Sequence, residues 1–154
     1  MKTLLLFFII ILSALNIYSQ TKNIETDLYL VVSSDSCTGN NNAHTIKFLS
    51  DTLCLKNEPV ISIQDMESCI MDSMQLEGKE QHSLNIKLKG SAGLRLKEIT
   101  TANVGKRLVF IIDNEIVMAP IIRDPITSGR LAVYDEYPVI KELYTKLKRE
   151  IDQL

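Results

Sequence analysis

The clearest pattern of hydrophobic and polar positions lies in the second half of the chain. Residues 84–88 read LNIKL, so apolar side chains share one face and polar side chains share the other. Period two with one polar face predicts a strand of an antiparallel sheet. Residues 108–112 are continuously apolar, which predicts a central strand buried on both faces. The Asp-Asn pair at 113–114 predicts a tight turn back into a strand at 116–118, because asparagine tolerates positive φ.

Helical spacing marks two further segments and a shorter third one. Ser91 is expected to cap a helix that Gly105 ends in the left-handed conformation. Pro138 suits the first turn of a last helix. The apolar stripe of that helix consists of Ile140, Leu143, Leu147 and Ile151. A capping-box pattern at 62–65 predicts a short helix of about two turns.

Shorter segments rich in β-branched and aromatic residues complete the pattern. They lie at 26–32, 44–49, 53–55, 71–76 and 131–134, separated by turn-forming residues. The strands at 71–76 and 84–88 are expected to pair as a hairpin around the polar residues between them. The whole pattern predicts a single α+β domain, with a mainly antiparallel sheet packed against two or three helices.

The N-terminal twenty residues have the layout of a secretory signal peptide, with Lys2, an apolar run at 4–12, and then small or polar residues. The run is shorter than the roughly 20 residues that span a bilayer. We therefore expect residues 1–20 to be a signal peptide and residues 21–154 to be the exported domain, periplasmic or secreted. The alternative is an uncleaved segment that anchors the chain in the membrane.

The charge of the chain limits the partners that it suits. It carries 17 Lys and Arg against 19 Asp and Glu, a formal charge of −2. Loss of residues 1–20, which contain one lysine and no acidic residue, changes the charge to −3. A mildly acidic domain lacks the basic surface that nucleic acids and anionic lipids require. We expect no nucleic-acid partner, and membrane contact only if the N-terminal segment stays uncleaved.

The three cysteines allow one internal disulfide in an exported protein. Cys37 with Cys54 is the preferred pair, because it would hold the polar loop at 38–43 against the next strand. Closing a loop of this size contributes on the order of 3 kcal/mol. Cys69 lies among apolar residues and is expected to be buried. The sequence alone leaves the pairing open.

The best candidates for a nucleophile and its base are Cys37 and His44. No basic cluster or helix N-terminus that would lower the thiol pKa follows them. These two residues with Cys54 and Cys69 also lack the paired ligand spacing of zinc sites. The chain has no G-x-S-x-G, H-E-x-x-H or phosphate-loop pattern. We therefore expect no enzyme activity, no metal and no cofactor.

The stretch 100–130 combines unlike residues at fixed spacing: a threonine, Asn-x-Gly-Lys, an apolar strand, a tight turn, a strand with Ala-Pro, and a loop glycine. These positions are Thr100, Asn103, Gly105, Lys106, Asp113, Ala119, Pro120 and Gly129. Their order resembles the head part of the first large periplasmic domain of SecD-type protein-export factors, most strongly over 84–134. Asn114 stands where the family has glycine, which is a conservative change in a turn.

The resemblance implies a non-enzymatic periplasmic module that contacts unfolded polypeptide, with a role linked to protein export. The proton-coupled work of the family depends on charged residues in membrane helices, so we do not expect this chain to drive translocation itself. Extended polypeptide or an envelope protein is expected to bind by strand addition. The expected contact residues are Met118, Pro120, Ile121, Ile122 and Ile126. An alternative is a structural or assembly subunit of the envelope that docks through its terminal helix at 137–152.

Overall fold

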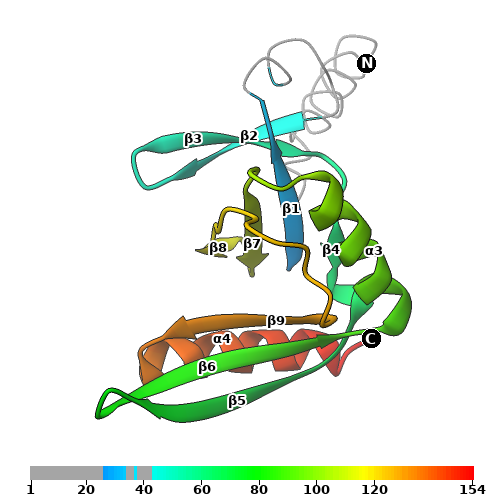
Figure 1. The fold of residues 1–154 in the computed structure, drawn as a ribbon. Helices are drawn as coiled ribbons and strands as arrows, with labels where there is room; N and C mark the ends of the chain where they lie inside the picture. Colours follow the sequence, from blue (N-terminus) through cyan, green and yellow to red (C-terminus); the bar gives the residue numbers. More distant parts are fainter. Residues whose placement is uncertain (1–25, 34–36, 38–42) are drawn as a thin grey trace, which may run out of the picture.

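The structure is a computed structural model that describes residues 26–33, 37 and 43–154 (Figure 1). The expected signal peptide at 1–20 lies outside the described residues. Strands β1 to β9 span Asp27–Val32, Ala43–Phe48, Asp51–Lys56, Ile61–Ser62, Met66–Leu76, Lys79–Leu88, Leu108–Ile112, Glu115–Met118 and Arg130–Asp135. The helical segments are the single 3-10 turn η1 (Ile63–Asp65) and the helices α3 (Gly90–Ala102) and α4 (Tyr137–Ile151).

The first sheet is built around the buried strand β7. Its strand order is β2-β3-β1-β7-β8, with β4 pairing to β1, and its described pairs are antiparallel. All five residues of β7 are buried, as the continuous apolar run predicts. The turn residues Asp113 and Asn114 both have positive φ, 51° and 66°, and lead into β8. β8 therefore forms one edge of this sheet and β2 forms the other.

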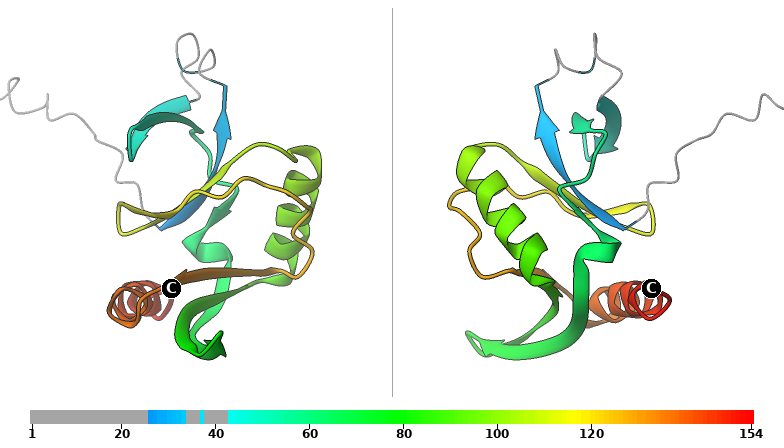
Figure 2. Two further views of the ribbon diagram at one scale, coloured as in Figure 1. Left: turned by 60° about the vertical axis from the view of Figure 1, so that its left-hand side comes forward. Right: turned by 90° about the vertical axis from the view of Figure 1, so that its right-hand side faces the viewer.

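The second sheet has the order β5-β6-β9. The three apolar residues of the stretch 84–88 are at most 4% exposed and face the interior, as their alternation predicts. α4 packs on this side of the sheet with Ile140, Leu143 and Leu147 buried. Figures 1 and 2 show α4 running along the sheet and the β5–β6 hairpin forming one extremity of the molecule. The mainly antiparallel β-structure expected from the sequence is present and is divided between two sheets.

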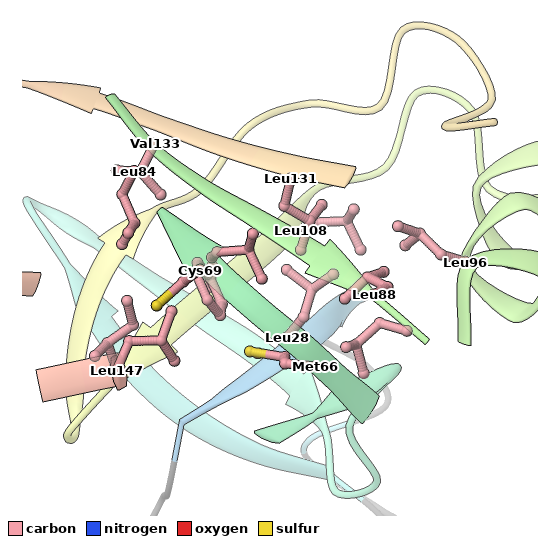
Figure 3. Packing of buried hydrophobic residues seen from close by; sticks show 14 of the residues in the cluster. Leu28, Met66, Cys69, Leu84, Leu88, Leu96, Leu108, Leu131, Val133 and Leu147 are labelled. Atoms are coloured by element: carbon pink, nitrogen blue, oxygen red, sulfur yellow. The ribbon is translucent and has the colours of Figure 1, made fainter. Parts of the chain in front are cut away.

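One hydrophobic core joins the two sheets and both α-helices. It includes Leu28 and Leu108 from the first sheet, Leu84 from the second, Leu96 from α3 and Leu147 from α4. Figure 3 shows these side chains converging in one cluster. A smaller cluster on the opposite face of the first sheet consists of Tyr29, Leu55, Val109 and Ile111. Because the main core draws on every layer, the described elements form one α+β domain.

The helix of about two turns that the capping-box pattern at 62–65 predicts is shorter in the structure. η1 is a single turn, because the chain enters β5 directly at Met66. The capping box itself forms, since Ser62 N–H donates to Asp65 Oδ2 at 2.9 Å. The local pattern therefore marks where the helical turn begins but carries no information about where it ends.

Two other boundaries differ from the sequence prediction. α3 begins at Gly90 with Lys89 as its N-cap, so Ser91 lies inside the first turn and does not cap the helix. β5 and β6 continue to a two-residue turn at 77–78, where the sequence suggested a longer polar loop. The hairpin is therefore longer and reaches further from the core than its apolar residues indicate.

Candidate functional site

The segment expected to bind a partner forms the outer edge of the first sheet. β8 pairs with β7 as far as Met118, with a register shift along the pair. Beyond β8 the pairing continues: Leu108 N–H donates to Pro120 O at 3.0 Å, and Ile122 N–H donates to Lys106 O at 2.8 Å. Residues 115–122 therefore form one extended edge that is longer than β8 itself.

Pro120 leaves this edge open. Backbone groups of an antiparallel strand point alternately to the neighbouring strand and to the open side. The Pro120 carbonyl accepts a bond from Leu108, so its nitrogen also faces the sheet. Ile121, which lies opposite Arg107, then directs its N–H and C=O outward. The N–H group that Pro120 lacks would have pointed toward the neighbouring strand. The N–H and C=O groups of Ile121 remain on the open side of the edge.

The five residues expected to bind a partner divide between core and surface. Ile122 is 5% exposed and belongs to the main core, and Met118 and Ile126 pack partly buried against that core. Ile121 is 50% exposed, and Pro120 is also exposed. Alternation explains the exposure of Ile121, because Met118 and Ile122 share the side that faces the core and Ile121 lies on the other side. Pro120 has the same parity as Met118 and Ile122 but is exposed. The available surface is therefore Pro120, Ile121 and the adjoining backbone.

The loop after this edge is held against α3. Figures 1 and 2 show residues 119–129 leaving the first sheet and running along α3 to β9. Thr100 is fully buried in α3, and its Oγ1 accepts Ile126 N–H at 2.9 Å. Further along, a Cβ placed on Gly93 would lie only 3.2 Å from the Gly129 Cα. These two contacts hold the loop along α3. No sequence motif predicts the bond between Thr100 and Ile126.

The Asn-x-Gly-Lys motif builds the inner partner of the edge. Gly105 has a φ of +87° after the end of α3, and its N–H donates to Ile122 O at 2.8 Å. Asn103 Nδ2 donates to Ile99 O at 2.8 Å, which closes the last turn of the helix. Lys106 Nζ donates to Asn103 Oδ1 at 2.8 Å. The motif therefore ends α3 and leads the chain into the segment that pairs with Ile122.

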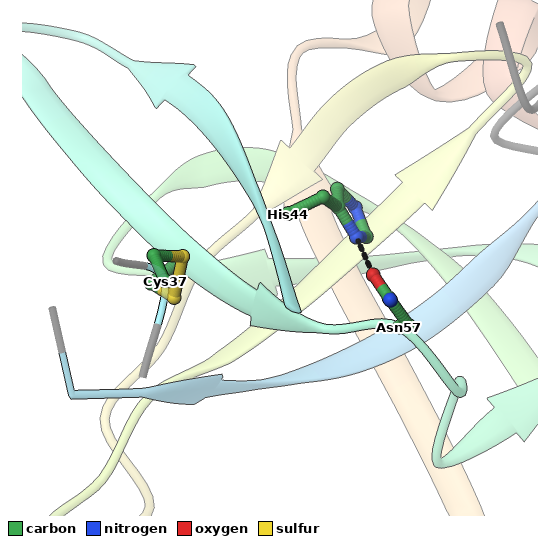
Figure 4. The surroundings of a disulfide bond; sticks show 4 residues. Cys37, His44 and Asn57 are labelled. Atoms are coloured by element: carbon green, nitrogen blue, oxygen red, sulfur yellow. Dashed lines mark hydrogen bonds between the residues drawn. A yellow bond between two sulfur atoms is a disulfide. The ribbon is translucent and has the colours of Figure 1, made fainter. Parts of the chain in front are cut away.

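A disulfide joins Cys37 to Cys54 on β3, the pair preferred from the sequence (Figure 4). His44 lies on the neighbouring strand β2, with its Nδ1 3.0 Å from Asn57 Oδ1. Its ring packs edge-on against Tyr29, with the centroids 5.7 Å apart. Because Cys37 is bound to Cys54, it offers His44 no free thiol to activate.

The third cysteine, Cys69, is buried in β5 as a free thiol. Burial raises the pKa of this thiol to about 11, so it stays protonated near neutral pH. A protonated, buried thiol is a poor nucleophile. Within residues 26–33, 37 and 43–154, no three His, Cys, Asp or Glu side chains are grouped as a metal site requires.

α4 does not offer its apolar stripe to a partner, because that stripe belongs to the main core. On its exposed side, Lys146 Nζ lies 3.1 Å from Glu142 Oε1 and 3.2 Å from Glu115 Oε2. The second contact ties the helix to the start of β8. Neither helix in the described part of the chain has the length and apolar character needed to cross a membrane.

The chain is similar in sequence to parts of known export proteins. A sequence model described as "SecDF, P1 head subdomain" matches residues 40–136. SecD of Aquifex aeolicus is 32% identical over 74 residues, which cover 48% of this chain and 14% of that protein. SecD of Thermobaculum terrenum is 45% identical over 47 residues, covering 30% of this chain and 9% of that protein. The chain thus spans only a small part of the SecD proteins that it matches.

Two solved structures share the fold. SecDF in its super-membrane-facing form superposes with a TM-score of 0.57 at 17% identity, covering 79% of this chain and 18% of that one. Another SecDF structure, of a membrane component that enhances protein export, gives 0.54 at 18% identity, covering 80% and 63%. At such identities the likeness shows the fold alone. The family match, however, extends over more than half of the residues, and the chain therefore belongs to the family of the SecDF P1 head subdomain.

Proposed function

We propose that this protein is an exported, periplasmic, non-enzymatic module that binds extended polypeptide by strand addition, in a role linked to protein export. The observation that carries the proposal is the open edge at 115–122, where Ile121 presents outward backbone groups and a half-exposed side chain. Backbone hydrogen bonds in strand addition give affinity that tolerates many sequences, and side chains add modest selectivity. Such binding suits unfolded chains, and membership of the SecDF P1 head family supports the link with export.

The edge is well supported for this task. Its inner side is held by backbone bonds to residues 105–108, and the loop that follows is held by Thr100. A strand that is already extended and fixed loses little conformational entropy when a partner binds, which favours affinity. Extended polypeptide is therefore a better match for this edge than a folded partner that needs a deep pocket.

Site-specific photo-crosslinking in the native cell envelope tests the proposal. The probe replaces Ile121, and a control probe replaces Leu94, which is 65% exposed on α3. We expect adducts with many unrelated exported chains from position 121 and few from position 94. One dominant adduct from position 121 would indicate a dedicated envelope partner instead. Absence of adducts at 121 would overturn the placement of the site.

A backbone variant tests the mode of binding. Ile121→Pro removes the outward N–H, and because that group faces away from the sheet, no internal hydrogen bond is lost. We expect polypeptide binding to fall while the melting temperature stays close to that of the parent protein. Ile121→Ala keeps the donor and serves as the control. A folded Ile121→Pro variant that binds as well as the control would refute strand addition at this edge.

A further inference from the structure

A charged side chain, Arg107, lies next to the exposed part of the edge at 115–122. It stands directly opposite Ile121 in an antiparallel pairing. The backbone hydrogen bonds to Pro120 O and from Ile122 N–H flank this pair on its two sides. Arg107 and Ile121 are therefore a non-hydrogen-bonded pair, in which the opposed side chains lie close together on one face of the sheet. The arginine thus shares the face of Ile121, one strand in from the open side.

The positive charge of Arg107 is not neutralised within the protein. Its side chain is partly buried, and no described residue forms an ion pair or a hydrogen bond with its guanidinium group. The neighbouring side chains on this face, Val109 and Ala119, are apolar and belong to the smaller cluster. A cation without a partner beside apolar side chains favours a negative group in any chain that binds there.

The acidic residues near this edge do not offset that charge. Glu115 pairs with Ile112 of the main core, so it lies on the opposite face of the sheet. Asp27 shares the arginine's face, but it pairs with the far end of β7, and its buried carboxylate accepts the Tyr29 hydroxyl at 2.9 Å. Asp124 follows the paired edge in the loop and is preceded there by another arginine. The uncompensated charge on the Ile121 face is therefore positive.

We propose that Arg107 makes the edge selective for extended polypeptide segments that carry a glutamate or aspartate opposite Ile121. The outward N–H and C=O of Ile121 would hydrogen-bond with one residue of the added strand, and paired residues direct their side chains to the same face. The Cα atom of that residue would lie two strand spacings, or about 10 Å, from the Arg107 Cα. Extended arginine and glutamate side chains together span this distance, so an ion pair can form across Ile121.

This selectivity rests on the proposed function of strand addition at the edge, and it specifies the chemical class of the bound segment. Three labelled peptides test it, each of about eight residues to match the edge. They share a valine- and threonine-rich sequence and differ only in a central glutamate, glutamine or lysine. We expect the purified chain to bind the glutamate peptide about threefold more tightly than the glutamine peptide, and the lysine peptide most weakly, because partly exposed ion pairs are worth a few-fold in affinity. The preference should shrink as salt is added.

Three variants assign the preference to one side chain. Arg107→Met keeps an apolar stem and removes the charge, so the glutamate preference should disappear while binding of the glutamine peptide is unchanged. Arg107→Lys keeps the charge and should retain part of the preference. Lys97→Met is the matched control, because it makes the same change in net charge at an exposed position on α3. It should keep the full preference, and melting temperatures will show that each variant is folded.

Ile121→Pro separates the selectivity from strand addition itself. Equal binding of the three peptides that is lost in Ile121→Pro would leave the proposed function standing and overturn the selectivity. A glutamate preference that persists in Arg107→Met, or that disappears in Lys97→Met, would overturn the role of Arg107. Failure of all three peptides to bind, or binding that Ile121→Pro does not reduce, would overturn the proposed function and the selectivity together. Loss of the preference in Arg107→Met alone, with loss of binding in Ile121→Pro, would support both.

Discussion

Replacing Thr100 with valine should loosen the loop that follows the β8 edge. Thr100 is fully buried, and its Oγ1 donates to Leu96 O at 2.8 Å and accepts Ile126 N–H at 2.9 Å. Valine has nearly the same shape but no hydroxyl group. Leu96 O still accepts the helical bond from the Thr100 backbone. The Ile126 N–H, in contrast, is left without its partner.

The expected loss follows from that single orphaned donor. A partly buried backbone N–H without a partner costs about 1–2 kcal/mol in the free energy of unfolding. Thr100→Ser keeps the hydroxyl and loses a buried methyl group, which is worth about 1 kcal/mol. Global stability therefore falls in both variants by similar amounts. The two variants are therefore distinguished by the exchange rates of individual amides and not by global stability.

Native-state hydrogen exchange makes that comparison. Relative to the amides of β7, the Ile126 amide should exchange about tenfold faster in Thr100→Val, because 1.4 kcal/mol corresponds to a factor of ten. In Thr100→Ser it should exchange as in the parent protein. Unchanged protection of the Ile126 amide in Thr100→Val, with a change of less than about 0.5 kcal/mol in the free energy of unfolding, would refute this role of the Thr100 hydroxyl.

Three further predictions concern other parts of the fold. Burial, which would raise the pKa of Asp65, is outweighed by hydrogen bonds from Ser62 and Arg95, so this pKa is lowered. A lowered carboxyl pKa contributes stability that is complete above about pH 4 and is lost as the pH falls through the pKa of the folded state. Asp65→Asn should therefore flatten the acidic part of a plot of unfolding free energy against pH. Gly93→Ala should gain none of the usual helical stabilisation, because its Cβ would lie 3.2 Å from the Gly129 Cα. Gly90→Ala has open space around its Cβ and should not lower the melting temperature in thermal denaturation. The buried free thiol of β5 should resist a thiol reagent at neutral pH and react only after unfolding, as a colorimetric thiol count will show.

Local physical chemistry explains what the sequence predicts well. The run at 108–112 is buried on both faces because no polar side chain interrupts it. Gly105, Asp113 and Asn114 adopt the positive φ that their turn chemistry indicates. The resemblance over 84–134 also depends on such local devices, since most of its motif residues form a helix end, a turn and a strand pair. The family match at 40–136 extends further than that stretch.

Tertiary context decides what the sequence does not predict. The neighbours Ile121 and Ile122 are chemically identical, and only the pairing with residues 105–108 determines that one is exposed and the other buried. Residues 71–80 of the hairpin are exposed on both faces, so this part of the strands lacks the period-two signal that marks 84–88. The bond from Ile126 to Thr100 joins residues that no sequence motif relates.

The contacts of the main core also determine how late in folding the edge at 115–122 becomes ordered. Leu28 on β1 faces Phe110 on β7, so the central strand pair joins residues about 80 positions apart, and closing so long a loop slows folding. Leu147 on α4 completes the same core although it lies beyond the matched residues 40–136. A chain that emerges from its N-terminus cannot close this core until α4 has followed. The edge at 115–122 becomes ordered only at that late step, and until then the chain exposes its apolar segments as an unfolded polypeptide does.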